Sequence, residues 1–230
     1  MPASTTGPVH TATASAPVAV ALTRIPGLSS GWRSAAGALR MHRAARELLG
    51  ELAELLAKDT GVELPPRGDA WPQHPSGAPA PALASDGQPW HWAVSHSRGL
   101  VAAALCRSGP LGLDLEATDR SPSQNIAERL AQLGVPAAQL ATADGCRQAW
   151  TRSEAVLKAT GTGLGGLSKL RHLASPRTDD PVARLEFEGR PFAARTLHHT
   201  CEGETSPAIG ACLTVAHAGT CPPHIEFLPR

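Results

Sequence analysis

The sequence lacks an excess of charge of either sign, because 21 Lys and Arg residues are balanced by 20 Asp and Glu residues and the formal net charge is +1. Broad electrostatic binding to nucleic acid or to an anionic membrane surface is therefore not expected, although this balance leaves room for a local basic patch. No apolar run approaches the roughly 20 residues that span a bilayer, and the run at residues 18–22 is too short for the core of a signal peptide. We therefore expect a cytoplasmic protein without a membrane partner. Residues 1–17, rich in Ala, Thr and Ser, are expected to form a flexible tail.

Cysteine is scarce, odd in number and never arranged as a CxxC pair, which argues against a disulfide framework or a zinc knuckle. The histidines and cysteines between residues 198 and 224 fit no standard spacing of zinc ligands. The alternative to a metal cluster is that the cysteines are small hydrophobic residues of a sheet, and we favour this interpretation. The residues concerned are Cys106, Cys146, Cys201, Cys212 and Cys221.

Apolar residues in the first half of the chain recur with the periods of strands and of one long helix. They predict a first strand over residues 18–25 and an amphipathic helix over residues 34–58. Residues 61–88 are rich in Pro, Gly and Ala and indicate an irregular connection. Turn residues separate three further short runs, which we interpret as an antiparallel meander over residues 90–95, 100–106 and 111–116.

The second half begins with helical patterns and ends with alternating apolar residues. Helices are predicted over residues 123–133 and 144–159. Alternation predicts a second small sheet with strands over residues 182–188, 191–198, 208–217 and 224–228. The order of the elements predicts an α+β protein of two comparable lobes, one over residues 18–118 and the other over residues 119–230.

Two acidic residues stand on the third run of the expected meander, within Gly112-Leu113-Asp114-Leu115-Glu116. Residues two apart on a strand point to the same face, so Asp114 and Glu116 should present neighbouring carboxylates while the leucines enter the core. Like charges at that separation repel unless a cation lies between them, and hard oxygen ligands favour Mg²⁺ or Ca²⁺ over zinc. The alternative is a solvated strand face without a ligand.

A second group of polar residues lies on the helix expected at residues 144–159. At 3.6 residues per turn, Trp150, Glu154 and Lys158 form one stripe on the helix surface. An aromatic ring, an acid and an amine in one stripe suit the lining of a phosphate and metal pocket. The alternative is an ordinary i,i+4 pair of Glu154 and Lys158, which would stabilise the helix by only a few tenths of a kcal/mol.

Ser95-His96-Ser97 ends one of the expected strands. A nucleophilic Ser–His pair is not indicated, because adjacent strand residues point to opposite faces and the sequence has no GxSxG motif. Hydroxyl and imidazole groups donate hydrogen bonds to anions, so phosphate contact is one interpretation and a polar strand end is the other. Residues 161–166 match G-x-G-x-x-G but follow a helix instead of a strand, so they do not predict a dinucleotide site.

In this order and spacing, the three groups resemble the signature of the larger, two-lobed 4'-phosphopantetheinyl transferases, the surfactin-type activators of polyketide and peptide synthases. The resemblance is densest over residues 87–166. It implies a pseudo-dimer of two similar α+β lobes with the active site in the cleft between them. It also implies a monomeric enzyme that transfers the 4'-phosphopantetheine of coenzyme A to a serine of an apo acyl or peptidyl carrier protein. Such holo-[acyl-carrier-protein] synthase activity serves fatty acid, polyketide or nonribosomal peptide biosynthesis.

The resemblance assigns roles to the acidic and basic residues. Asp114, Glu116 and Glu154 would hold Mg²⁺, with Mn²⁺ as a substitute, on the pyrophosphate of coenzyme A. Glu154 would also be the base for the carrier serine. Lys158 would contact phosphate and help the adenosine 3',5'-bisphosphate to depart.

Four further residues would bind coenzyme A by the same resemblance. Ser95 and His96 match a pair of residues near the nucleotide phosphates. Arg46 on the first long helix matches an arginine that reaches the nucleotide, and Arg40 is the weaker candidate for that role.

Two positions depart from the family pattern. Ser153 stands where a lysine commonly precedes the glutamate, and Gln88 stands in Gly-Gln-Pro where Gly-Lys-Pro is frequent. Both remove positive charge from the expected nucleotide region, so we expect Ser153→Lys to tighten coenzyme A binding, and Arg147, Arg152 or Lys169 to be candidates for compensation. The alternatives are a non-catalytic relative that binds coenzyme A or a carrier, and a metal-dependent phosphodiesterase or pyrophosphatase.

Overall fold

The computed structural model describes residues 17–25, 28, 34–64, 71–119, 121–173, 180–202, 208–219 and 221–227. The tail expected at residues 1–17 lies outside the described residues except for its last residue. Within the described part, the chain is a mixed α+β structure with two sheets and several helices. No helix in that part is both long and apolar enough to cross a membrane.

The first sheet has the strand order β10-β1-β4-β3-β2. Its strands are β1 (Val18–Arg24), β2 (Ala82–Leu83), β3 (Pro89–Ser97), β4 (Leu100–Cys106) and β10 (Ile225–Phe227). The second sheet has the order β5-β9-β8-β7-β6. Its strands are β5 (Leu111–Ala117), β6 (Leu170–His172), β7 (Val182–Phe187), β8 (Arg190–Cys201) and β9 (Ile209–Ala218).

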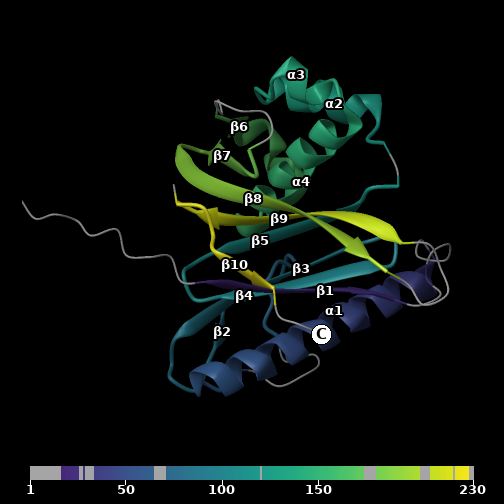
Figure 1. The fold of residues 1–230 in the computed structure, drawn as a ribbon. Coiled ribbons are helices and arrows are strands. Elements are labelled where there is room, and N and C mark those ends of the chain that lie inside the picture. The colour runs from purple at the N-terminus through teal and green to yellow at the C-terminus, as the bar shows by residue number, and fades with distance from the viewer. Residues whose placement is uncertain are drawn as a thin grey trace, which may run out of the picture.

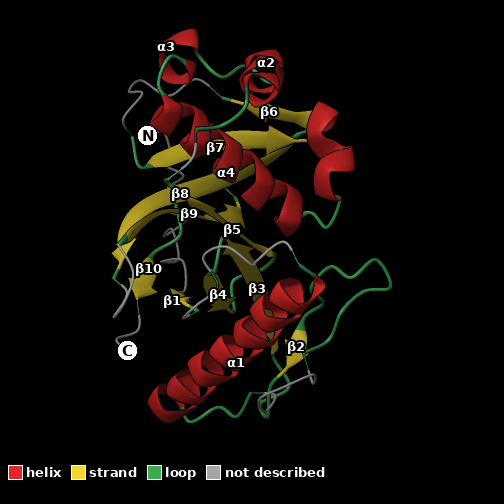
Figure 2. Ribbon diagram, turned by 90° about the vertical axis from the view of Figure 1, so that its right-hand side faces the viewer, coloured by secondary structure: helices red, strands yellow, loops and turns green. Residues whose placement is uncertain are grey.

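The helices cover the outer faces of the two sheets, so the molecule has four layers (Figures 1 and 2). The long helix α1 covers the first sheet, and α4 crosses the second sheet with α2 and α3 beyond it. Apolar side chains fill each of the three interfaces between layers. The helical elements are α1 (Ala35–Thr60), α2 (Gln124–Gln132), α3 (Ala137–Leu140), α4 (Ala143–Ala159) and the 3-10 helix η1 (Gly163–Lys169).

Helix α1 begins and ends as its sequence predicts. The Oγ of Ser34 accepts a hydrogen bond from the backbone N–H of Gly37 at 3.0 Å, which satisfies one of the free donors of the first turn. Gly61 follows the last turn in the left-handed region, with φ of 69°, and its N–H bonds to the carbonyl of Ala57. Met41, Leu48 and related residues at helical spacing are buried against the first sheet, which confirms the amphipathic pattern.

The expected three-stranded meander is wrong, because β5 belongs to the second sheet. β3 and β4 form the predicted antiparallel hairpin, but β5 pairs with β9, where Asp114 lies opposite Thr214. The turn before β5 contains Gly109 with φ of 132° and then a proline, and the chain passes here from one sheet to the other. Leu113 and Leu115 are then buried between the two sheets. A pattern of short strands and turns does not say which sheet a strand joins.

The last strand also departs from its expected place. β10 was expected in the second sheet but pairs in parallel with β1, with Ile225 opposite Val18. The two sheets therefore exchange strands across the expected boundary at residues 118 and 119. The two sheets nevertheless share one pattern of pairing. In the first sheet, β1 precedes helix α1 and pairs antiparallel with β4, the second strand of the β3–β4 hairpin. In the second sheet, β5 precedes helix α4 and pairs antiparallel with β9, the second strand of the β8–β9 hairpin.

Candidate functional site

Strand β5 places its two acidic residues beneath helix α4. The leucines of β5 face the first sheet, so alternation turns Asp114 and Glu116 to the other face, as the sequence predicts. A glycine at position 112 lets the helix approach closely, because a Cβ there would lie 1.8 Å from the carbonyl oxygen of Ala155. The close approach brings the polar stripe of α4 to the carboxylates of β5.

Lys158 of α4 lies among the oxygens of this group. Its Nζ is 2.5 Å from Asp114 Oδ1, 3.1 Å from Ser95 Oγ and 4.0 Å from Glu154 Oε2. The hydroxyl of Ser95 also donates to Asp114 Oδ1 at 3.3 Å. Ser97, two residues further on β3, donates to Glu116 Oε2 at 3.1 Å. Residues from β3, β5 and α4, far apart in sequence, therefore meet at one place, here called the carboxylate cluster: Ser95, Asp114, Glu116, Glu154 and Lys158.

Burial and the charge of Asp114 raise the pKa values of the two glutamates of the cluster. Burial raises the pKa of Glu154 to about 8, with the charge of Asp114 as the second cause, and the nearby Lys158 opposes the rise. The pKa of Glu116 is raised for the same two reasons in the same order. A glutamate with a pKa of about 8 holds its proton in most molecules at pH 7, so added positive charge would release that proton.

The donor set suits a hard cation, although the side chains are not arranged around one. Asp114 Oδ2 is buried without a hydrogen-bond partner in the described structure, and it belongs to a residue with only 3% of its surface exposed. An orphaned carboxylate oxygen beside two further carboxyl groups is the environment in which Mg²⁺ or Ca²⁺ binds. Within the described ranges, however, no three His, Cys, Asp or Glu side chains are grouped as metal ligands. Lys158 takes the contact with Asp114 instead.

A pocket of about 440 Å³ opens on one side of the cluster, and we call it the Arg147 pocket. His96, Glu116, Arg147 and Trp150 contribute to its wall. Arg147 is almost completely buried. It donates a hydrogen bond to the backbone carbonyl of Thr118 at 3.2 Å and forms an ion pair of 3.0 Å with Asp144. Of the three cations considered as compensating charges, Arg147 is the one that the structure places beside the cluster.

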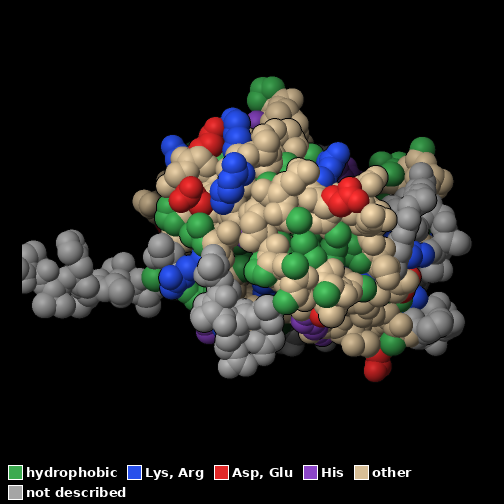
Figure 3. Space-filling view, turned by 90° about the horizontal axis from the view of Figure 1, so that it is seen from above, with side chains coloured by type: hydrophobic (Ala, Val, Ile, Leu, Met, Phe, Trp, Pro, Cys, Tyr) green, Lys and Arg blue, Asp and Glu red, His purple; other side chains and the backbone are tan. Residues whose placement is uncertain are grey.

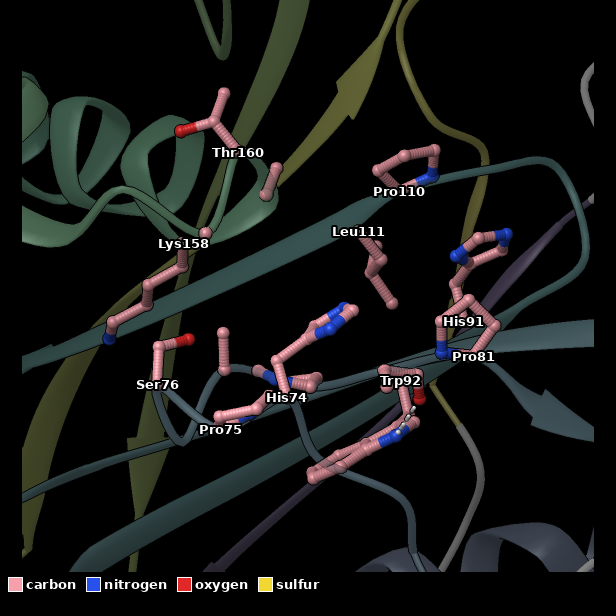
Figure 4. Close-up of a pocket in the computed structure, with 15 residues that line it drawn as sticks. His74, Pro75, Ser76, Pro81, His91, Trp92, Pro110, Leu111, Lys158 and Thr160 are labelled. Carbon is pink, nitrogen blue, oxygen red and sulfur yellow. Dashed lines mark hydrogen bonds between the residues drawn. The ribbon is translucent and has the colours of Figure 1, made fainter.

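A larger pocket of about 660 Å³, the His74 pocket, opens beside Lys158 (Figure 4). Figure 4 shows the ring of His74, from the connection before β2, pointing toward Leu111 of β5, with His91 and Trp92 of β3 along the same pocket. The indole N–H of Trp92 donates to the carbonyl of Ala80 at 2.8 Å, which ties the connection to the sheet. A further pocket of about 300 Å³, lined in part by His42 of α1, also includes Lys158 in its wall.

Sequence patterns did not single out His42 and His74, which line these two pockets. His74 lies in the stretch at residues 61–88 that was interpreted only as an irregular connection, and His42 lies on the polar side of a helix in which only arginines were considered. Neither position shows a spacing or motif that sets it apart. Their place at the site follows from the packing of the connection and of α1 against β3.

The structure does not bring every predicted residue to the cluster. Ser95 reaches it directly, and His96 lines the Arg147 pocket. Arg40 and Arg46, both described residues of α1, line none of the three pockets, although His42 between them does. The prediction that either arginine contacts a nucleotide stays a prediction.

Ser153 does not face the site. Its side chain is completely buried on another face of α4, where Oγ donates to the carbonyl of Ala149 and lies 2.8 Å from Nε2 of His172 on β6. The structure therefore contradicts the orientation assumed for this position, because the side chain faces the core and not the carboxylate cluster. Arg152 is likewise buried against Thr196, and Lys169 pairs with Glu188 at 2.7 Å, so these two residues do not supply the charge either.

The surface above α2, α3 and α4 is mixed in charge. Figure 3 looks onto this side of the molecule and shows Lys and Arg side chains interspersed with Asp and Glu, with hydrophobic side chains gathered near the middle. The visible part of this face therefore carries no broad field of one sign.

No protein-family model matches the sequence, and no curated protein matches it significantly.

Proposed function

We propose that this protein is a 4'-phosphopantetheinyl transferase that moves the phosphopantetheine arm of coenzyme A to a serine of an apo carrier protein. The observation that carries the proposal is the carboxylate cluster. The three sequence groups of the resemblance come from separate elements, yet Asp114, Glu154, Lys158 and Ser95 lie within one network of contacts. The Arg147 pocket and the His74 pocket lie beside this cluster and would allow two substrates to approach it.

The two-lobed architecture of the family is part of the proposal. The matched pairing of β1 with β4 and of β5 with β9, each pair next to one long helix, supports a pseudo-dimer of related lobes. Ser95 belongs to the first sheet and Asp114 to the second, so the site would lie where the lobes meet. An arrangement of this kind needs no second copy of the chain, and we propose a monomer.

Asp114, Glu116 and Glu154 would hold Mg²⁺ or Mn²⁺. The unpartnered oxygen of Asp114 supports this assignment, and so do the raised pKa values of the two glutamates, which arise first from burial and then from the charge of Asp114. A bound divalent cation would neutralise charge that develops on the pyrophosphate oxygens as the bond to the leaving group breaks.

The chain's own residues supply the remaining chemistry. A serine hydroxyl is a poor nucleophile, and Glu154 would accept its proton once positive charge at the site has lowered the pKa of this glutamate. Lys158 would donate hydrogen bonds to the phosphate that leaves with the nucleotide. Ser95 would orient Asp114 through the hydrogen bond between them.

The proposal is tested by incubating the protein with coenzyme A, Mg²⁺ and apo acyl or peptidyl carrier proteins, and by following the intact mass of each carrier. We expect a gain of one phosphopantetheine that EDTA abolishes. Asp114→Asn and Glu154→Gln should each lower the initial rate by about 100-fold or more, because they remove a metal ligand or the base. Glu188→Gln, an exposed change at the pair with Lys169, is the matched control and should keep the wild-type rate.

Other outcomes would contradict the proposal in different ways. Binding of coenzyme A without transfer to several carriers would identify a non-catalytic relative. Release of phosphopantetheine or of another hydrolysis product without any carrier would identify a phosphodiesterase or pyrophosphatase. Wild-type transfer by both cluster variants would show that the chemistry takes place elsewhere.

A further inference from the structure

We infer that Lys158 is the internal counter-ion of the carboxylate cluster and that a divalent cation binds by displacing it. The inference rests on the proposed function, because it concerns the cation that the same residues would hold. It states that the ammonium group and Mg²⁺ compete for the oxygens of Asp114 and Glu154.

The contacts of the ammonium group are those of a cation held by the cluster. Nζ lies 2.5 Å from Asp114 Oδ1, donates to Ser95 Oγ at 3.1 Å and is 4.0 Å from Glu154 Oε2. It thus contacts Asp114 directly and lies at the outer limit of an ion pair with Glu154. Among the described residues no three such side chains are grouped as metal ligands, which agrees with an ammonium group in the place of a metal ion.

The two partners differ in how easily they can leave. The side chain of Asp114 is only 4% exposed, so its charge stays in the cluster, whereas the side chain of Lys158 is 37% exposed. The second oxygen of Asp114 has no hydrogen-bond partner in the described structure, so the ammonium leaves one oxygen of this buried carboxylate without a direct contact. A divalent cation would compensate it better than a single positive charge does.

Two pockets adjoin Lys158 and would accept the ammonium group after displacement. Lys158 lines both the His74 pocket and the adjoining pocket that includes His42, so a change of its side-chain rotamer would carry the amine into solvent-accessible space (Figure 4). Cation binding would then free the one lysine of the cluster for an anionic group in these pockets. Metal binding and phosphate contact by Lys158 would be successive events at the same site.

The test is the affinity of the purified full chain for Mg²⁺ alone, measured by titration calorimetry without coenzyme A. Lys158→Met keeps much of the length and apolar surface but removes the competing charge, so Mg²⁺ should bind about tenfold more tightly or better. Lys158→Arg keeps a charge and should stay near the wild-type affinity. Lys169→Met removes a charge from an exposed ion pair and is the matched control, with no change expected.

A second measurement needs no destabilising change. In wild-type protein labelled with ¹³C at lysine Cε, the Lys158 signal, assigned by its loss in Lys158→Arg, should shift in step with Mg²⁺ saturation. An unmoved signal during binding, or a folded Lys158→Met variant that binds Mg²⁺ no more tightly than wild type, overturns the inference. Absence of Mg²⁺ binding in all variants overturns it as well, and removes the metal from the proposed function.

The two proposals can fail separately. Carrier modification by the wild-type enzyme together with equal Mg²⁺ affinities would keep the transferase and reject the competition. Tighter Mg²⁺ binding by Lys158→Met together with no modification of any carrier would keep the competition and reject the transferase.

Discussion

At the scale of single residues, Glu154 shows how neighbours from elsewhere in the chain change the chemistry of one carboxyl group. On an isolated helix it would be an ordinary exposed acid paired with Lys158. In the folded protein it lies beside Asp114 of β5, and burial together with that charge raises its pKa to about 8. The same close approach that brings Glu154 to Asp114 also makes this glutamate costly to ionise.

The raised pKa predicts how stability depends on pH when no metal is present. The unfolded chain releases this proton near pH 4.5, whereas the folded protein keeps it up to about pH 8, so the folded state binds more protons in between. The contribution of Glu154 to the free energy of unfolding therefore falls as the pH rises through this window. Urea unfolding in EDTA at several pH values should show a smaller fall for Glu154→Gln than for wild type. Equal slopes for the two proteins would contradict the raised pKa, whereas a residual slope is expected from Glu116.

At the scale of elements, helix α4 carries two kinds of face. Glu154 and Lys158 turn toward Asp114 of β5, and Lys158 also lines the His74 pocket, while the neighbouring Ser153 turns into the core and contacts His172 of β6. Adjacent helix residues are about 100° apart around the axis, so one position can face the carboxylate cluster and the next the core. Burial lowers the pKa of His172 to about 3, and this histidine is therefore neutral beside Ser153.

Ser153→Lys is accordingly expected to damage the fold instead of improving the site. It would bury a charge next to the already buried Arg152, at a cost on the order of 4 kcal/mol in the free energy of unfolding. Ser168→Lys makes the same change at an exposed position of η1 and is the control, with little effect expected. Urea unfolding measures both variants. A stable Ser153→Lys protein with tighter coenzyme A binding would show that position 153 faces the nucleotide after all.

At the scale of the whole molecule, the two sheets share one apolar interface. Leu113 and Leu213 of the second sheet pack in the same cluster as Val20 and Ala102 of the first. The last strand strengthens the connection, since β10 pairs with β1 while Arg195 of β8 donates to the carbonyl of Pro223 just before it. We therefore expect the sheets to unfold together, even if they belong to two related lobes.

Leu213→Ala tests this cooperativity, because the leucine is completely buried between the sheets. The cavity should lower the free energy of unfolding by about 2–5 kcal/mol. Hydrogen exchange under conditions of global unfolding should accelerate equally for the amides of β4 and β8, which lie in different sheets. Leu83→Ala at an exposed position is the control. Acceleration confined to the second sheet would show that the halves unfold independently.

Local pattern predicted most of the elements that the structure contains. The period of apolar residues placed α1 and α4 within two residues of their observed ends, and turn residues delimited β4 at residues 100–106. Alternation on β5 correctly placed Asp114 and Glu116 on one face of the strand. Helical spacing correctly placed Glu154 and Lys158 on one face of α4. These features follow from the repeat of a strand or helix alone, which sequence spacing fixes without knowledge of the partners.

The sequence by itself therefore determined the mixed composition of helices and strands, the paired carboxylates and the stripe on α4. Only the tertiary structure decided that β5 and β10 join the opposite sheets from those expected, that Ser153 lies in the core, and that His42 and His74 line pockets near Lys158. The physical reason is the range of the interactions. Periodicity determines which way a side chain points from its own element. Sheet partners and pocket walls depend instead on contacts between residues that are distant in sequence. Gly112 and Ala155 are one example, because the lack of a side chain at Gly112 sets the distance between β5 and α4.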